Sequence, residues 1–152
     1  MKNANHKLIL QSFAKLTLYF VVLTVTSCTK SNSVGGINIS ASQTKSIIQN
    51  GSWKVSYFFD SGDETYKFSG YNFTFNASGA VAAIKSSTTI NGTWSSGNDD
   101  SQVKFVLDFN GVSPFNDIED DWHVISQTNS EVKLIDVSGG NGGTDYLTFS
   151  KN

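Results

Sequence analysis

Apolar and polar residues alternate with a period of two through most of the chain after residue 51. The segment "WKVSYFF" puts Trp53, Val55, Tyr57 and Phe59 on one predicted side, with Phe58 on the other. The same alternation aligns Tyr71, Phe73 and Phe75 in "YNFTFN", and Val103, Phe105, Leu107 and Phe109 in "VKFVLDF". Strict alternation of this kind predicts β-strands with one buried and one solvent-facing side.

Short turn-forming segments such as "NASG" and "QTNSE" separate these runs. The runs predict eight strands, near 52–60, 66–76, 80–86, 88–95, 102–109, 121–127, 131–137 and 145–150. Sequential strands joined by short turns pair with their neighbours, and closing such a sheet removes its exposed edges. We therefore expect an all-β fold, an antiparallel up-and-down eight-stranded β-barrel, in residues 39–152.

One short helix is predicted before the first strand, in "SASQTKSIIQNG" (40–51). Ser42 is the expected N-cap, and Gly51 lies where such a helix would stop. A bulge or bend is expected at Gly70, because Phe68 and Tyr71 on either side of it differ in parity.

The chain begins with a positively charged segment followed by an uncharged apolar run. Three lysines precede "LTLYFVVLTV" (16–25), and small residues follow it. This order is typical of a secretory signal peptide. The ten apolar residues are too few for a spanning helix, which needs roughly 20. We predict that residues 1–27 are a signal peptide.

Cys28 is the only cysteine of the chain, and it directly follows "VTS". The tetrapeptide "VTSC" resembles the lipobox of bacterial lipoproteins. The resemblance implies that Cys28 carries a diacylglycerol thioether, that cleavage occurs before it, and that its new amino end is acylated. Two or more acyl chains anchor a protein stably, whereas one does so only marginally. A free or incidentally buried thiol is the alternative.

Residues 28–38 are rich in Ser, Asn and Gly and predict a lipidated flexible tether. Thr29 stands where, in Gram-negative sorting, an aspartate would favour retention in the inner membrane. The resemblance therefore implies the outer membrane. The absence of an acidic tract after Cys28 favours the leaflet that faces the periplasm.

The predicted mature chain has 125 residues, enough for one domain. Its eight lysines against thirteen carboxylates give a net charge of −5, and it contains no arginine. Nucleic-acid binding depends on cationic contacts to phosphate, so this composition argues against a nucleic-acid partner.

The segment "NGSWKVSYFF" (50–59) follows the predicted helix and opens the first strand with Gly51-x-Trp53. This arrangement resembles the first motif of the lipocalin superfamily, and the chain looks like the small lipocalin-like domains of bacterial lipoproteins. In lipocalins the tryptophan packs under an arginine from late in the barrel, and this chain has none. The resemblance implies the barrel fold.

The aromatic residues are concentrated after residue 51 and either fill a core or line a pocket. An eight-stranded barrel is either filled by side chains or holds one small ligand. The first hypothesis is an envelope protein that binds or carries a small apolar molecule. Its expected wall residues are Trp53, Tyr57, Phe73, Trp94 and Phe105. The alternative is a non-catalytic structural or interaction subunit with a filled barrel. Phe58, which is expected on the exposed side of its strand, would favour this alternative.

Catalytic and metal-binding patterns are weak. His123 is the only histidine of the predicted mature chain and is expected at the surface or rim, and no GxSxG segment occurs. We expect no enzymatic activity, no cofactor and no metal. The acidic "NDIEDD" (116–121) lacks EF-hand spacing and predicts a solvated loop, with calcium binding as the alternative. The Gly-rich "SGGNGGTD" (138–145) predicts a hairpin tip.

Overall fold

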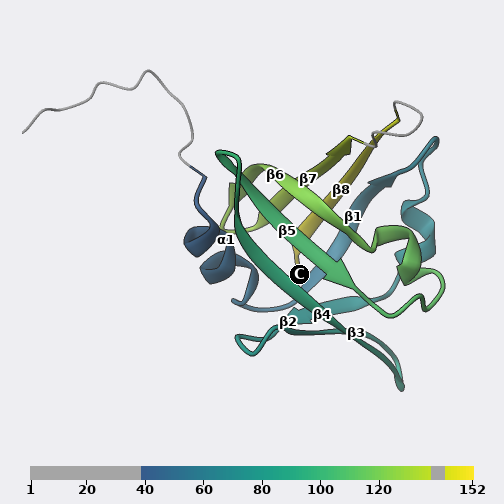
Figure 1. The fold of residues 1–152 in the computed structure, drawn as a ribbon. Coiled ribbons are helices and arrows are strands. Elements are labelled where there is room, and N and C mark those ends of the chain that lie inside the picture. Colours follow the sequence, from purple (N-terminus) through teal and green to yellow (C-terminus); the bar gives the residue numbers. More distant parts are fainter. Residues whose placement is uncertain (1–38, 138–142) are drawn as a thin grey trace, which may run out of the picture. The chain divides into compact units, whose positions relative to one another are not determined.

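The computed structural model describes residues 39–137 and 143–152 (Figure 1). The predicted signal peptide, Cys28 and its tether, and most of the predicted hairpin tip at 138–145 lie outside these residues. Within the described part of the chain, no helix is both long and apolar enough to cross a membrane.

Eight antiparallel strands form a closed barrel in which every strand pairs with its neighbours in sequence and β8 returns to β1. The strands are β1 (Trp53–Phe59), β2 (Asn72–Phe75), β3 (Ala80–Lys85), β4 (Thr88–Asp99), β5 (Gln102–Asp108), β6 (Asp120–Thr128), β7 (Glu131–Val137) and β8 (Thr144–Lys151). The predicted fold class is confirmed. The second strand is shorter than predicted because residues 65–68 form a 3₁₀ helix.

Helix α1 (Ala41–Ile48) precedes the first strand, as predicted, but the predicted cap is wrong. Ser40 is the N-cap: its backbone is extended, and its Oγ accepts a hydrogen bond from the backbone N–H of Gln43 at 3.3 Å. Ser42 lies inside the first turn, so its hydroxyl cannot take that position. Ile48 of α1 is fully buried.

Because the strands alternate in direction, the barrel has two distinct ends. The helix end carries α1, the β2–β3, β4–β5 and β6–β7 turns, and the C-terminus. The loop end carries the other four connections. At the helix end, the hydroxyl of Thr44 on α1 donates to the side-chain oxygen of Gln127 on β6 at 2.6 Å. This bond ties α1 to the barrel wall.

A register shift in β1 between Val55 and Tyr57 reverses the predicted sides of the strand. Trp53 and Val55 are buried as expected, but after the shift Phe58 is the buried residue, at 0% exposure, and Tyr57 is 38% exposed. A bulge inserts one extra residue, so every later side chain changes side. The predicted inward position of Tyr57 and Phe59 and the predicted exposure of Phe58 are therefore wrong.

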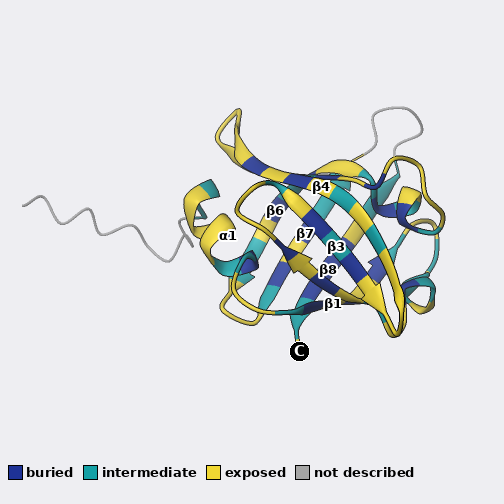
Figure 2. Ribbon diagram, turned by 90° about the horizontal axis from the view of Figure 1, so that it is seen from below, coloured by how far each residue is buried: buried dark blue, intermediate teal, exposed yellow. Residues whose placement is uncertain are grey.

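The centre of the barrel is packed with aromatic rings. Phe149 lies 5.4 Å from both Phe73 and Phe75, centroid to centroid, and Phe75 lies 5.8 Å from Phe105. These pairs meet edge to face, the geometry that aromatic rings favour. Figure 2 shows the buried residues recurring along the strands of the barrel. The interior is thus occupied by the protein's own side chains.

Two 3₁₀ helices close part of the loop end, η1 (Thr65–Phe68) and η2 (Phe115–Ile118). The ring of Phe115 contacts Phe68 at 5.9 Å and Tyr71 at 5.0 Å. Gly70, between these two partners, has a φ of +82°, so the predicted bend is confirmed.

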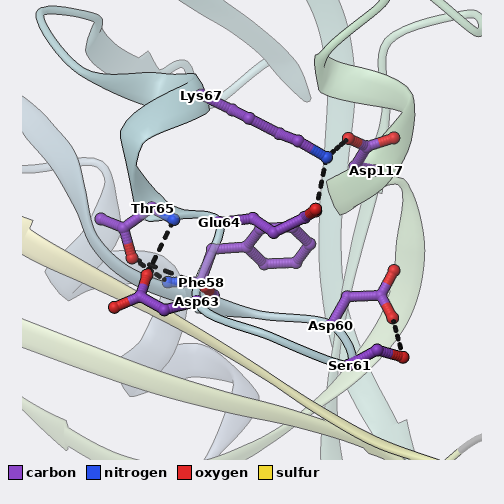
Figure 3. Close-up of polar contacts among 8 residues, drawn as sticks. All are labelled: Phe58, Asp60, Ser61, Asp63, Glu64, Thr65, Lys67 and Asp117. Carbon is purple, nitrogen blue, oxygen red and sulfur yellow. Dashed lines mark hydrogen bonds and ion pairs between the residues drawn. The ribbon is translucent and has the colours of Figure 1, made fainter.

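Polar contacts hold η1 in place (Figure 3). Lys67 forms ion pairs with Glu64 and with Asp117 of η2, the latter at 2.7 Å, and these hydrogen bonds raise the pKa of Lys67. The backbone N–H of Phe58 donates to Thr65 Oγ1 at 2.8 Å, which fixes η1 to the end of β1.

Candidate functional site

A cleft of about 470 Å³ opens on the side of the barrel. Its aliphatic lining comes from Ile39, Val103, Val124, Ile125, Ile135 and Val137, and its polar lining from Ser101, Gln102 and His123. Small-molecule sites are typically clefts of about 300–1,000 Å³ with mostly apolar walls and a few polar groups. We refer to this hollow as the side cleft.

Two irregularities in strand pairing accompany the side cleft. The β5–β6 ladder runs only from Lys104 opposite His123 to Leu107 opposite Asp120, so it stops short of Gln102 and Val103 at the beginning of β5. In addition, the pairing of β6 with β7 shifts register around Ile125. A bulge leaves one residue unpaired and re-aims its side chain. The barrel wall is therefore irregular where the cleft lies.

Burial differs between the residues that line the side cleft. Val103 and Val124 are buried at 5% and 6% exposure, while Ile125 and Val137 are 48% and 63% exposed. His123 is half-buried and lies opposite Ile135 across the β6–β7 pairing. An apolar molecule can therefore cover exposed aliphatic surface while its polar group reaches the imidazole.

A second hollow, of about 380 Å³, lies on the outer face of β1, β8 and β7. Tyr57, Ile125 and Tyr146 are among its lining residues, and Ile125 also lines the side cleft. The ring of Phe59 lies 6.5 Å from that of Tyr57 and 6.3 Å from that of Tyr146. The outer face thus carries three neighbouring aromatic residues, Tyr57, Phe59 and Tyr146, which we call the outer aromatic group.

The five predicted wall residues do not line the side cleft. Trp53, Phe73 and Phe105 are 0% exposed and Trp94 is 5% exposed, so four of the five meet in the packed interior. The indole N–H of Trp94 donates to the backbone oxygen of Asn76 at 2.9 Å. Tyr57 lies on the outside and borders the second hollow.

The cleft residues that sequence reasoning missed are aliphatic. One signal was available: Val124 and Ile125 are adjacent, as are Leu134 and Ile135, so apolar residues occupy both parities of β6 and β7. A strand with water on one side seldom needs apolar residues on both. These pairs indicate an apolar outer surface at this part of the barrel.

The acidic segment 116–121 is not a loop, because η2 and the start of β6 occupy it, but Asn116, Asp120 and Asp121 are exposed to solvent as predicted. Asp117 pairs with Lys67, and a carboxylate oxygen of Glu119 accepts from the backbone N–H groups of Phe109 and Gly111 at 2.7 and 2.8 Å. Asp117 and Glu119 therefore have separate structural partners.

Carboxylate oxygens of Asp120, Asp121 and Asp136 come within 4.8 Å of one another. Burial raises the pKa of Asp120, whereas the hydrogen bond from Lys104 lowers the pKa of Asp121. The ammonium of Lys104 lies 2.6 Å from Asp121 and already neutralises part of the group. We assign no metal to these three carboxylates.

Comparison with known proteins supports the architecture. No protein-family model matches the chain, and no curated protein matches it. Among solved structures, the crystal structure of a DUF4847 family protein from Bacteroides vulgatus ATCC 8482 is similar, with a TM-score of 0.50 and 17% sequence identity. The match covers 72% of this chain and 97% of that one. At this identity the likeness concerns the fold alone.

Proposed function

We propose that this chain is a lipid-anchored protein of the cell envelope with a lipocalin-like domain, which binds a small apolar molecule in the side cleft. The observation that carries the proposal is the cleft itself, about 470 Å³ with six aliphatic lining residues and one histidine. The proposed role is binding, without a catalytic step or a cofactor.

Because the interior is packed, we place the proposed binding site on the side of the barrel and not in its centre. Edge-to-face rings such as Phe75 and Phe149 occupy the volume that a central ligand would need. The side cleft instead offers exposed aliphatic surface, including Ile125 and Val137. Covering such surface with an apolar ligand is favourable by roughly 25 cal/mol per Å² removed from water.

The proposed anchor rests on the sequence around Cys28. The charged start, the short apolar run and the small residues before the cysteine occur in the order of a lipoprotein signal. We propose the outer membrane, on the side that faces the periplasm, as its location. Cells grown with labelled palmitate should incorporate the label into the wild-type chain and not into Cys28→Ser. Equal labelling of both, or a soluble unlabelled wild type, would contradict the anchor.

Ligand binding is tested by extracting natively purified protein with organic solvent and identifying the released molecules by mass spectrometry. The variant Ile125→Asp places a charge in the cleft and should lose the apolar molecule. Ile84→Asp is the matched control, since Ile84 is also an exposed strand isoleucine but does not line the cleft. Wild-type protein that releases nothing, or equal recovery from both variants, would contradict the proposed site.

A second candidate function is a non-catalytic interaction subunit of an envelope complex. The outer aromatic group of Tyr57, Phe59 and Tyr146 favours it, because exposed aromatic residues are enriched in protein interfaces. Cross-linking in native membranes should then trap one constant partner with the wild type. The double variant Tyr57→Lys/Tyr146→Lys should lose that partner, and retention of it would exclude this face.

A further inference from the structure

Charged residues are distributed unevenly between the two ends of the barrel. Ten of the thirteen acidic residues lie at the loop end: Asp60, Asp63, Glu64, Asp108, Asp117, Glu119, Asp120, Asp121, Asp136 and Asp145. Two of them, Asp120 and Asp145, have their pKa raised by burial and by neighbouring carboxylates. The loop end is therefore strongly negative.

Lysines slightly outnumber acidic residues at the helix end, where Lys133 pairs with Glu131. Lys45, Lys54, Lys133 and Lys151 lie there, against Asp99, Asp100 and Glu131. Of the two described lysines near the loop end, Lys67 pairs with Asp117 and Lys85 donates to the backbone oxygen of Ser69. Lys104, near the start of β5, pairs with both Asp99 and Asp121. An anionic surface would therefore repel the loop end and tolerate the helix end.

The helix end is also where the described chain begins. Ile39, which precedes α1, lines the side cleft together with Ile125. The eleven residues from Cys28 to Asn38 separate Ile39 from the proposed lipid anchor. Eleven residues span at most about 40 Å when fully extended. An anchor at Cys28 therefore keeps the Ile39 side of the cleft within that distance of the membrane.

We propose that the helix end of the barrel rests on the bilayer surface with Ile39 and Ile125 against lipid, and that the side cleft takes in an acyl chain of a bilayer phospholipid. This inference rests on the proposed anchorage and names the ligand class of the proposed cleft. The charge distribution determines which end of the barrel faces the membrane, and the short connection to Cys28 keeps Ile39 close to it. The aliphatic lining of the cleft suits a hydrocarbon chain.

The test uses the full mature chain in vesicles of phosphatidylethanolamine and phosphatidylglycerol. Acylation would block Cys28, the only native cysteine, so one introduced cysteine can carry a thiol-reactive fluorophore. Ile125→Cys reports on the cleft. Ile84→Cys is the matched control: both are exposed strand isoleucines, at 48% and 37%, and Ile84 lies near the loop end of β3. A phospholipid with a nitroxide on its acyl chain serves as the quencher.

The expected result is several-fold stronger quenching of the fluorophore at residue 125 than at residue 84. Equal quenching, or stronger quenching at residue 84, would overturn the orientation. Quenching at residue 125 by a free nitroxide fatty acid, but not by the nitroxide phospholipid, would also overturn the inference, because the ligand would then not come from the bilayer. Treating the wild-type chain with the same reagent tests the anchorage separately. If Cys28 reacts with the fluorophore, it is not acylated, and the proposed lipid anchor is contradicted.

Discussion

The ammonium nitrogen of Lys151 lies 5.8 Å from the centre of the Trp53 ring, so the last strand places a cation over the residue that opens the first strand. The two residues are also direct partners in the β1–β8 pairing that closes the barrel. Gly51 leaves room for this contact, since a Cβ there would lie 2.8 Å from Cε of Lys151. A lysine thus covers the tryptophan in a chain without arginine.

Replacing Lys151 tests the contribution of this contact. Lys151→Met keeps a long apolar side chain but removes the charge, and should lower the free energy of unfolding by about 0.5–1 kcal/mol, as is usual for cation–π contacts near the surface. Lys151→Arg should retain most of the stability, because guanidinium also stacks on aromatic faces. Urea unfolding followed by tryptophan fluorescence measures both. A methionine variant as stable as the wild type would exclude a cation–π contribution.

Two glycines of β4 provide a matched test of packing. A Cβ on Gly92 would lie 2.3 Å from the backbone oxygen of Asp108 and 2.8 Å from the Phe109 ring, whereas a Cβ on Gly97 would meet nothing within 4 Å. Gly92→Ala should destabilise the protein by about 1–3 kcal/mol, the usual cost of overpacking. Gly97→Ala should change the unfolding free energy little. Similar thermal unfolding midpoints for the two variants would show that the strands do not approach so closely at Gly92.

The alternation in the sequence predicts most of the barrel because each side chain in a regular strand has a fixed side. In β5, Val103, Phe105 and Leu107 are all buried, as is Phe109 just after it, and this prediction is confirmed. The prediction fails where the register shifts, as it does at Tyr57 and Phe58, because a bulge depends on pairing with a distant strand.

The side cleft could not be located from the sequence for the same reason. Its position follows from where the β5–β6 ladder stops and from the register shift at Ile125, and both depend on strands meeting in space. Alternation predicts that Trp53, Phe73 and Phe105 lie on the inner side of their strands, and all three are fully buried. Whether those rings leave a cavity depends on their mutual packing, which alternation does not encode.

Ser96 offers a test of polar burial in the core. Its hydroxyl is buried and has no hydrogen-bond partner within the described residues. Ser96→Ala should therefore leave the stability unchanged or raise it, since an unpaired buried polar group is costly. Thr44→Val is the contrast, because the Thr44 hydroxyl donates to Gln127 Oε1 at 2.6 Å and also lies 3.1 Å from the backbone oxygen of Ser40, and its loss should cost about 1–2 kcal/mol. If Ser96→Ala were the more destabilising of the two in chemical denaturation, Ser96 would have a partner.

At neutral pH, ionised Asp145 should make the protein less stable than an uncharged residue at the same position would. Burial raises the pKa of this carboxyl, and Asp60, Asp136 and Asp120 raise it further. The folded state then holds the proton more tightly than the unfolded state, so ionised Asp145 opposes folding, and this penalty is relieved as pH falls through the raised pKa. Asp145→Asn should raise the free energy of unfolding at pH 7, and this gain should fade as pH falls through the raised pKa and be absent below the ordinary value of about 3.9.

Asp121 is a control, because its pKa is shifted in the opposite direction and its charge should therefore have the opposite effect on stability. The hydrogen bond from Lys104 lowers the pKa of Asp121, so its ionised form favours folding above its ordinary pKa, and this stabilisation is lost as pH falls through the lowered value. Asp121→Asn should lower the free energy of unfolding at pH 7 and have little effect in strong acid. Urea denaturation of both variants across pH 3–7 tests the gain expected for Asp145→Asn and the loss expected for Asp121→Asn. If the two variants' differences from the wild type in unfolding free energy changed in the same direction with pH, these predictions would be contradicted.

The central claim is that this barrel binds an apolar molecule in its side cleft and not in its centre. Photo-crosslinking in intact cells, with a fatty acid that carries a diazirine on its chain and can be incorporated into membrane lipids, tests this most directly. The account predicts that mass spectrometry will map the cross-links to Ile39, Ile125, Ile135 and Val137, which line the cleft. Cross-links on Phe73 or Phe105, which are fully buried in the barrel interior, would contradict it.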